Sequence, residues 1–142
     1  MVIRQMAASD LPAVTAPCEQ LGYPTSLEEL TQRFARLNGR RGEYMLVAAH
    51  GDSVSGWIHV RRVDALESEP HAEVWGLVVD DQLRSRGVGR ALLETAERWA
   101  AAQALPLIRI RSNVVREEAH AFYTRAGYSI VKRQSGFDKR LG

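Results

Sequence analysis

The most constraining feature of this chain is an apolar run that is followed, after a short polar stretch, by a long helix that begins with glycines. Val74 to Val79 is almost entirely apolar, which is typical of a strand with both faces covered. Gly87 to Ala104 then carries apolar residues at helical spacing, with glycines at its first and third positions. A buried strand that leads into an amphipathic helix predicts a sheet covered by helices.

The first turn of this predicted helix is suited to bind an anion. Its backbone N–H groups have no partner within the helix, and the helix dipole adds partial positive charge there. Gly87 and Gly89 have no Cβ that would keep an anion away from these amides. Arg84, Arg86 and Arg90 add cationic side chains, so a diphosphate is the ligand that this chemistry suits. The alternative is a helix that merely starts with glycine and has a basic, solvated first turn.

Composition narrows the class of protein. A chain of 142 residues with 45% hydrophobic and 25% charged residues is typical of one globular domain. Its net charge of +2 is too small to predict a nucleic-acid or membrane partner by bulk attraction. Cys18 is the single cysteine, which excludes an intramolecular disulfide and favours a cytoplasmic location.

The hydropathy pattern predicts an α/β (α+β) fold made of one domain, residues 1–142. We expect a mixed, twisted central sheet of about six or seven strands flanked by about four helices. Pro17 is expected to kink or split the first helix, and a polar loop with Glu67, Glu69 and Pro70 is expected before the strand at 71–80. The expected strands are 2–6, 44–49, 54–63, 71–80, 107–111, 128–133 and 137–141, and the expected helices are 9–21, 26–37, 87–104 and 119–126.

Two motifs, in order along the chain, resemble those of the GNAT superfamily of N-acetyltransferases. Arg84-x-x-Gly87-x-Gly89, after a strand that ends Leu77-Val78-Val79, is similar to the acyl-CoA signature of that family. Ala119-x-x-Phe122-Tyr123-x-x-x-Gly127-Tyr128 is similar to its later motif. The resemblance covers the chain from about Tyr44 onward, whereas the helices at about 9–37 fit in layout only.

The resemblance implies a transferase that uses acetyl-CoA as co-substrate and has no metal. It implies an acetyl-CoA-binding core at about 43–142 and acceptor-side helices at about 9–37. Many members of the family have asparagine at the position of Arg116, and Asn113 lies three residues earlier, so which of the two contacts the cofactor stays open. Arg116 would reach a phosphate or simply cap the helix. The other expected cofactor-binding residues are Leu77, Val78, Val79, Arg84, Arg86, Gly87, Val88, Gly89 and Arg90.

The resemblance also implies direct attack of a primary amine in a ternary complex, without an acyl-enzyme. Cys18 is then not needed as a nucleophile, and we expect it to be a buried apolar filler. Tyr123 matches the tyrosine of the family that faces the CoA sulfur, and is our candidate general acid. The alternative is that Tyr123 packs in the core with Ala119, Phe122 and Ala126.

Glu73 is the candidate general base. Strict alternation places it on the same side of its strand as Trp75, Leu77 and Val79, where a carboxylate would be desolvated. The alternative is a solvated side chain near the start of the strand. His71 and His59 are the next candidates, each expected to be a surface or packed imidazole. His71-Ala72-Glu73 also matches a fragment of zinc deaminases, but the cysteine ligands that those enzymes need are missing.

The sequence constrains the acceptor substrate less than any other part of the predicted reaction. A small cationic amine such as an aminoglycoside, polyamine or amino acid is the first expectation, and a protein lysine or N-terminus is the second. The alternative from another functional class is a sensor that binds acyl-CoA without catalysing its turnover. A homodimer that forms through the C-terminal strands, including Phe137, is a further hypothesis. The acidic residues that would attract a cation, or would simply be solvated, are Glu19, Glu28, Glu29, Glu67, Glu69 and Glu73.

Overall fold

The computed structural model describes residues 1–20, 25–80, 87–111 and 117–142, apart from the side chains of residues 16–20 and 117–118. The chain divides into two compact units, Met1–Arg111 and Ser112–Gly142. The second unit contains α4 (Glu117–Arg125). The first unit contains β1 (Val2–Gln5), a 3-10 helix (Ala8–Asp10), α1 (Leu11–Gln20), α2 (Leu27–Leu37), β2 (Glu43–His50), β3 (Ser53–Ala65), β4 (Ser68–Val79), α3 (Val88–Ala102) and β5 (Ile108–Ile110).

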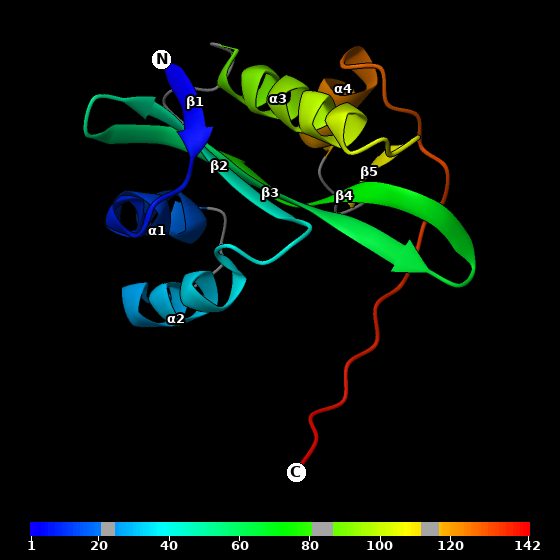
Figure 1. Cartoon of the computed structure of the whole chain (residues 1–142), viewed down its shortest axis with the longest axis horizontal. Coiled ribbons are helices and arrows are strands. Elements are labelled where there is room, and N and C mark those ends of the chain that lie inside the picture. Colours follow the sequence, from blue (N-terminus) through cyan, green and yellow to red (C-terminus); the bar gives the residue numbers. More distant parts are fainter. Residues whose placement is uncertain (21–24, 81–86, 112–116) are drawn as a thin grey trace. The chain divides into compact units, whose positions relative to one another are not determined.

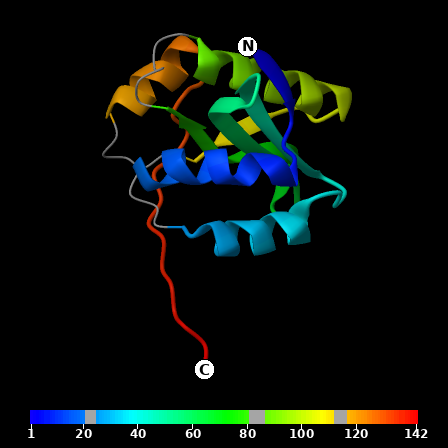
Figure 2. The same cartoon turned by 90° about the vertical axis from the view of Figure 1, so that its left-hand side faces the viewer.

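The strands of the first unit form a mixed sheet with the order β1-β2-β3-β4-β5. The first three pairings are antiparallel, and β5 pairs in parallel with β4 after the crossover through α3. Helix α3 covers one face of the sheet, and α1 and α2 cover the other (Figures 1 and 2). With its four α-helices, the chain has the α+β fold that the sequence predicts.

Helix α3 packs tightly on the sheet because β3 has a glycine beneath it. A Cβ at Gly56 would lie 2.8 Å from the carbonyl oxygen of Val78 and 3.2 Å and 3.3 Å from side-chain carbons of Val88 and Leu92. The buried face of α3 is the predicted apolar stripe, with Trp99 at its margin stacked on Tyr44 at a centroid distance of 5.2 Å. The glycine therefore sets the first turns of α3 directly against β3 and the end of β4.

The opposite face of the sheet is covered by a cluster from α1, α2 and the adjoining strands. Ser26 begins α2 as predicted, because its Oγ accepts a hydrogen bond from the Glu29 amide at 3.1 Å. Gly39, at φ +80°, follows the end of the helix. The buried side chains of this cluster are Met6, Leu11, Val14, Phe34 and Val47, with Trp57 packed against them.

Two details of the N-terminal half differ from the expectation. Helix α1 is continuous across Pro17, so the proline does not split it, and the expected kink stays a prediction. A tight turn at 66–67 takes the place of the polar loop before β4, and Glu69 and Pro70 belong to the strand. Pro70 is tolerated there because the β3–β4 register shifts between Val63 and Ala65, where a missing N–H costs no regular ladder bond.

The two C-terminal strands predicted at 128–133 and 137–141 are also absent. Residues 128–142 form no helix or strand, so the sheet in the described part of the chain has five strands rather than six or seven. Their apolar side chains are exposed, including Val131 at 76% and Phe137 at 93%. A short run of alternating residues becomes a strand only when another strand completes its hydrogen bonds. In the described residues no helix is long and apolar enough to cross a membrane.

The Arg4–Asp10 pair should contribute measurably to stability. Both guanidinium nitrogens of Arg4 donate to the Asp10 carboxylate at 2.8 Å, and the Ala7 amide donates to it at 2.8 Å. The hydrogen bond from Arg4 lowers the pKa of Asp10 below its ordinary value of 3.8. We expect Asp10→Asn to reduce the free energy of unfolding by about 1.5–3 kcal/mol at neutral pH.

This difference should shrink as the pH falls below about 4, because protonation of Asp10 removes the same interaction from the wild type. Urea unfolding at several pH values measures it, with Asp52→Asn in the exposed β2–β3 turn as the control. An equal loss at pH 7 and at pH 3 would contradict the assignment.

Candidate active site

Strand β4 contains an extra residue at Trp75. His59 pairs with Gly76 and the next residue of β3, Val60, pairs with Val74, so Trp75 has no partner of its own and forms a β-bulge. The bulge changes which residues share a face. Trp75 stays on the side of Glu73, since Arg111 contacts both residues, but Glu73 is 2% exposed and Trp75 is 53% exposed.

The bulge moves Glu73 to the face opposite Leu77 and Val79, with which it was expected to share a face. Val79 pairs with Gly56, which faces α3, whereas Glu73 pairs with Arg61 on the opposite face. Glu73 lies within β4 and is buried, so the alternative of a solvated carboxylate is wrong. The prediction that both faces of the apolar run are covered is confirmed at Val74 and Val78, which are buried, and is wrong at Trp75, which is exposed.

Beyond the bulge, β4 separates from its parallel neighbour. The β4–β5 register covers only Ala72–Val74 against Ile108–Ile110, with one more bond from the Ala72 amide to the Leu107 carbonyl at 2.9 Å. No strand among the described residues pairs with Leu77–Val79 on the β5 side. A polar, extended ligand arm would find backbone donors and acceptors there, as an added strand would.

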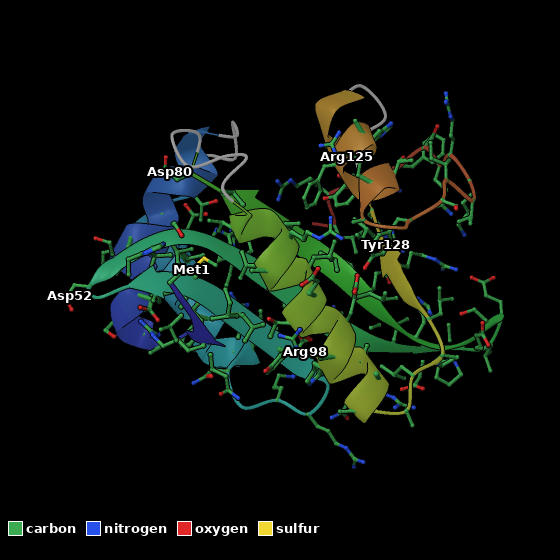
Figure 3. The ribbon with its side chains drawn as sticks, turned by 90° about the horizontal axis from the view of Figure 1, so that it is seen from above. Met1, Asp52, Asp80, Arg98, Arg125 and Tyr128 are labelled. Atoms are coloured by element: carbon green, nitrogen blue, oxygen red, sulfur yellow. The ribbon has the colours of Figure 1, made fainter. Side chains whose placement is uncertain are left out.

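Helix α3 starts close to this free edge of β4. Gly87 precedes its first turn in the left-handed conformation, at φ +80°, and no atom of the described residues lies within 4 Å of the place where a Cβ would lie. Val88 is buried and anchors the turn, and the Asp80 amide at the end of β4 (Figure 3) donates to the Ser55 carbonyl at 2.8 Å. An open, glycine-led helix start next to a strand edge fits the pyrophosphate and pantetheine arm of a coenzyme A ester.

The predicted cofactor-binding residues are only partly described. Arg90 is exposed, and its Nε donates to Glu94 at 3.0 Å, so its guanidinium is shared with a neighbour on the helix. Residues 77–79 and 87–90 lie at the strand end and helix start just described. Arg84, Arg86, Asn113 and Arg116 lie outside the described residues, and so does the side chain of Cys18.

Glu73 is held between an arginine and a histidine. Arg111, at the end of β5, donates from its Nε to Oε1 of Glu73. On the other side, His71 Nε2 lies 3.7 Å from Oε2 of Glu73. Arg109 is the parallel partner of Glu73 in β5. Since an isolated buried carboxylate would be costly, the Arg111 guanidinium offsets the burial of this charge.

Trp75 joins this pair to a second charged cluster. The Cζ atoms of Arg111 and Arg61 lie 5.6 Å and 4.8 Å from the centre of the Trp75 ring. Arg61 in turn bonds to Glu43 at 2.6 Å, and Glu43 also bonds to His59 Nε2 at 2.7 Å. The sheet face opposite α3 therefore carries a row of alternating charges around an exposed indole.

Sequence reasoning missed Arg61, Arg111 and Glu43. A signal was present for Arg111, because Arg109 and Arg111 alternate along the strand at 107–111 and so share one face with Glu73. The expectation that His71 and His59 are surface or packed imidazoles holds, since His71 is buried and His59 is half-buried in an ion pair.

Tyr123 lies on α4, in the second unit. Its ring is half-buried and meets the rings of Phe122 and Tyr128 edge-on, at centroid distances of 5.3 Å and 6.3 Å. Its carbonyl accepts a hydrogen bond from the Tyr128 amide at 3.0 Å, just after Gly127 ends the helix at φ +95°. The predicted apolar stripe of this helix is therefore present, and the catalytic role of Tyr123 stays a prediction.

Most of the acidic residues that might have attracted a cation are solvated. Glu28, Glu29, Glu67 and Glu69 are exposed, and Glu29 is paired with Arg33 at 3.2 Å. Glu73 is buried, and the side chain of Glu19 lies outside the described residues. Among the described residues, no group of three or more His, Cys, Asp or Glu side chains is placed to hold a metal ion.

Comparison with known proteins identifies the family of this chain. The model of the acetyltransferase (GNAT) family matches residues 9–128. The chain belongs to the GNAT acetyltransferases. It is thus an acetyl-CoA-dependent N-acetyltransferase.

Two kinds of relatives support the assignment. The aminoglycoside N(6')-acetyltransferase type 1 of Stenotrophomonas maltophilia is 33% identical over 111 residues, which is 75% of this chain and 71% of that protein. The crystal structure of AAC(6')-Ig from Acinetobacter haemolyticus has a TM-score of 0.84 at 18% identity, with both chains fully covered. A transcriptional regulator from Bacillus halodurans also has a TM-score of 0.84, at 20% identity over 99% of each chain. These structures show the shared fold.

Gly87 offers a direct test of the helix start as a cofactor site. We expect Gly87→Ala to lower the free energy of unfolding by about 1–2 kcal/mol, because alanine resists the left-handed conformation. We also expect it to weaken coenzyme A binding about tenfold, equivalent to about 1.4 kcal/mol, because the new Cβ enters the space in front of the amides. Chemical unfolding and calorimetric titration with coenzyme A measure the two effects.

Gly39→Ala is the matched control, since Gly39 has the same φ of +80° and the same open surroundings but lies after α2. It should reproduce the loss of stability and leave coenzyme A binding unchanged. Equal weakening of coenzyme A binding by both substitutions would remove Gly87 from the site.

Proposed function

We propose that this enzyme transfers the acetyl group of acetyl-CoA to a primary amine of a small cationic molecule, by direct attack in a ternary complex. The observation that carries the proposal is the buried Glu73 carboxylate, which lies on β4 next to the bulge and to the edge where the strand leaves β5. The acetyl-CoA thioester supplies the acetyl group. The amine must lose a proton before it attacks, and a free alkylamine with a pKa of about 10.4 is almost fully protonated at neutral pH.

Glu73 takes this proton as the general base. Arg111 pairs with Oε1, so the oxygen on the His71 side is the one that accepts. The Arg111 side chain is 62% exposed, which leaves it free to move when an ammonium group approaches the carboxylate. Burial protects the transferred proton from exchange with bulk water.

Tyr123 protonates the leaving thiolate as the general acid. This role rests on the match of its motif to the family, and on the half-buried position of its ring beside Phe122 and Tyr128. The cofactor is held by the amides at 87–90 and by the edge of β4 at 77–79. Asn113 or Arg116 completes the contacts, and the choice between them stays open.

A small cationic amine is the acceptor that we propose. The support is the 33% identity with a protein named as an aminoglycoside N(6')-acetyltransferase, together with the carboxylate of Glu73, which attracts an ammonium group. Aminoglycosides are therefore the first acceptors to test. Polyamines and amino acids follow, and short peptides test the alternative of a protein lysine or N-terminus.

The Tyr123→Phe variant tests the acid together with the acceptor class. We expect thiol release from acetyl-CoA that depends on an added amine of the panel, and we expect kcat about 100-fold lower in the variant. A thiol-reactive dye follows the release. Tyr128→Phe is the control, since it removes a hydroxyl from the neighbouring ring of the same unit and should keep kcat.

Wild-type kcat in Tyr123→Phe would remove the assignment of the acid. No thiol release with any amine of the panel, while acetyl-CoA still raises the unfolding temperature, would contradict the proposed acceptor class and leave an acceptor outside the panel or an acyl-CoA sensor.

The Glu73→Gln variant tests the base. We expect kcat/KM at neutral pH to fall about 100-fold and its dependence on pH to change, because glutamine cannot accept the proton. Glu69→Gln, an exposed residue on the same strand, serves as the control and should retain the wild-type profile. An unaltered pH profile of kcat/KM in Glu73→Gln would eliminate Glu73 as the base.

A further inference from the structure

His71 has an unusual place next to Glu73. It lies two residues before Glu73 on β4, and the β3 partners of the two residues, Val63 and Arg61, are also two apart, so both side chains point to the same face of the sheet. Both residues are 2% exposed. A histidine and a carboxylate are thus enclosed side by side, behind the place where the acceptor amine is proposed to react.

The backbone fixes how the imidazole ring carries its proton. His71 Nδ1 lies 3.0 Å from the carbonyl oxygen of Glu69. Because a carbonyl only accepts, Nδ1 must be the protonated nitrogen. In the neutral ring, Nε2 then presents a lone pair, and it is directed toward Oε2 of Glu73 at 3.7 Å.

This Nε2 is a buried atom without a hydrogen-bond partner in the described part of the chain. The distance of 3.7 Å to Glu73 is too long for a hydrogen bond, and neither atom has a proton to share while the ring is neutral and the carboxylate is ionised. Buried polar atoms normally find partners, so one that faces a carboxylate across a short gap needs an explanation. A proton placed between the two groups would satisfy both.

We propose that His71 is the positioning residue of the base: its Nε2 shares with Glu73 the proton that is removed from the acceptor amine. The proposal rests on the role of Glu73 given above. His71 acts through the carboxylate and does not itself contact the substrate, since its Nε2 is buried.

The proton balance is simple. An N–H bond of the acceptor ammonium breaks and an O–H bond forms on Glu73, while the electron pair stays on the nitrogen that attacks. The proton then passes to His71 Nε2, which leaves the carboxylate ionised beside an imidazolium that still donates from Nδ1 to Glu69. The proton returns by way of Glu73 and is released to solvent as turnover ends.

The charged groups around His71 favour this sharing. From β4, Glu73 faces the ring; from β3, a hydrogen bond from Arg62 lowers the pKa of Asp64, and the charge on His71 lowers it to a smaller extent. On β5, Arg111 binds Oε1 of Glu73 and Arg109 is its register partner. The Glu73 carboxylate stabilises the imidazolium, while Arg111 occupies the oxygen that His71 does not face.

The His71→Gln variant tests the proposal by activity. A glutamine amide can still donate to Glu73 but cannot take up a proton, so a purely structural role would survive the change. We expect kcat/KM at neutral pH to fall about tenfold and the acid limb of its pH profile to move, with the unfolding temperature little changed. His50→Gln, an exposed histidine at the end of β2, should retain the wild-type profile. Superimposable profiles for His71→Gln and the wild type would overturn the proposal.

A second measurement needs neither an acceptor nor a folded His71→Gln variant. Nitrogen NMR of the imidazole rings, on the full chain without substrates, should show His71 as the Nδ1–H tautomer with a lone pair on Nε2. In Glu73→Gln, the Nε2 resonance of His71 should shift, because the carboxylate that faces this atom is gone. His50 is the internal control and should not shift.

The two measurements separate the possible failures. Coupling by NMR without acetylation of any amine in the panel would contradict the proposed function and support the His71–Glu73 pair. Acetylation that needs Glu73, with no coupling between the two residues, would overturn the proposal for His71 alone.

Discussion

The register change at Trp75 is the constraint on which the geometry around Glu73 depends. An extra residue in β4 lets Glu73 and the end of the strand face opposite sides of the sheet. It also coincides with the point where β4 leaves β5, so one irregularity produces both the buried carboxylate and the free strand edge. A regular strand would have paired Trp75 with β3 and directed Glu73 and Leu77 to the same face. The bulge therefore brings the proposed base and the proposed cofactor edge together within a few residues of one strand.

Much of the fold follows from local signals in the sequence. Ser26 and Asn38-Gly39 delimit α2, the apolar stripe defines α3, and the Gly51-Asp52 turn joins β2 to β3. These features depend on residues that are near in sequence, which is why pattern reasoning finds them. The bulge was missed because an apolar run such as Val74–Val79 carries no alternation that a shift by one residue would interrupt. The C-terminal strands were predicted from alternation alone, without the partner strand that they would need.

The residues of the candidate site also fall into two groups, those that the sequence reveals and those that only the folded chain brings together. Glu73 and the glycines at 87 and 89 are visible in the sequence, because their residue types and their order along a strand, a turn and a helix already suggest the chemistry. Arg111 is 38 positions away from Glu73 in the sequence, and only the parallel pairing of β5 with β4 brings it to the carboxylate. The orientation of His71 depends on a bond to the backbone of Glu69, which no side-chain pattern reveals. Contacts of this kind are properties of the folded sheet.

The environment of Trp75 gives the protein an optical property of its own. The chain has three tryptophans, and they sit in different surroundings: Trp57 is packed against the α1–α2 cluster, Trp99 is stacked on Tyr44, and Trp75 is exposed beside two guanidinium groups. An indole in contact with water emits at longer wavelength than an enclosed one. The red edge of the intrinsic fluorescence therefore comes mainly from the residue that lies two positions from Glu73. Any molecule that displaces Arg61 or Arg111 from that ring will change the emission, so the enzyme carries a native reporter of occupancy next to Glu73.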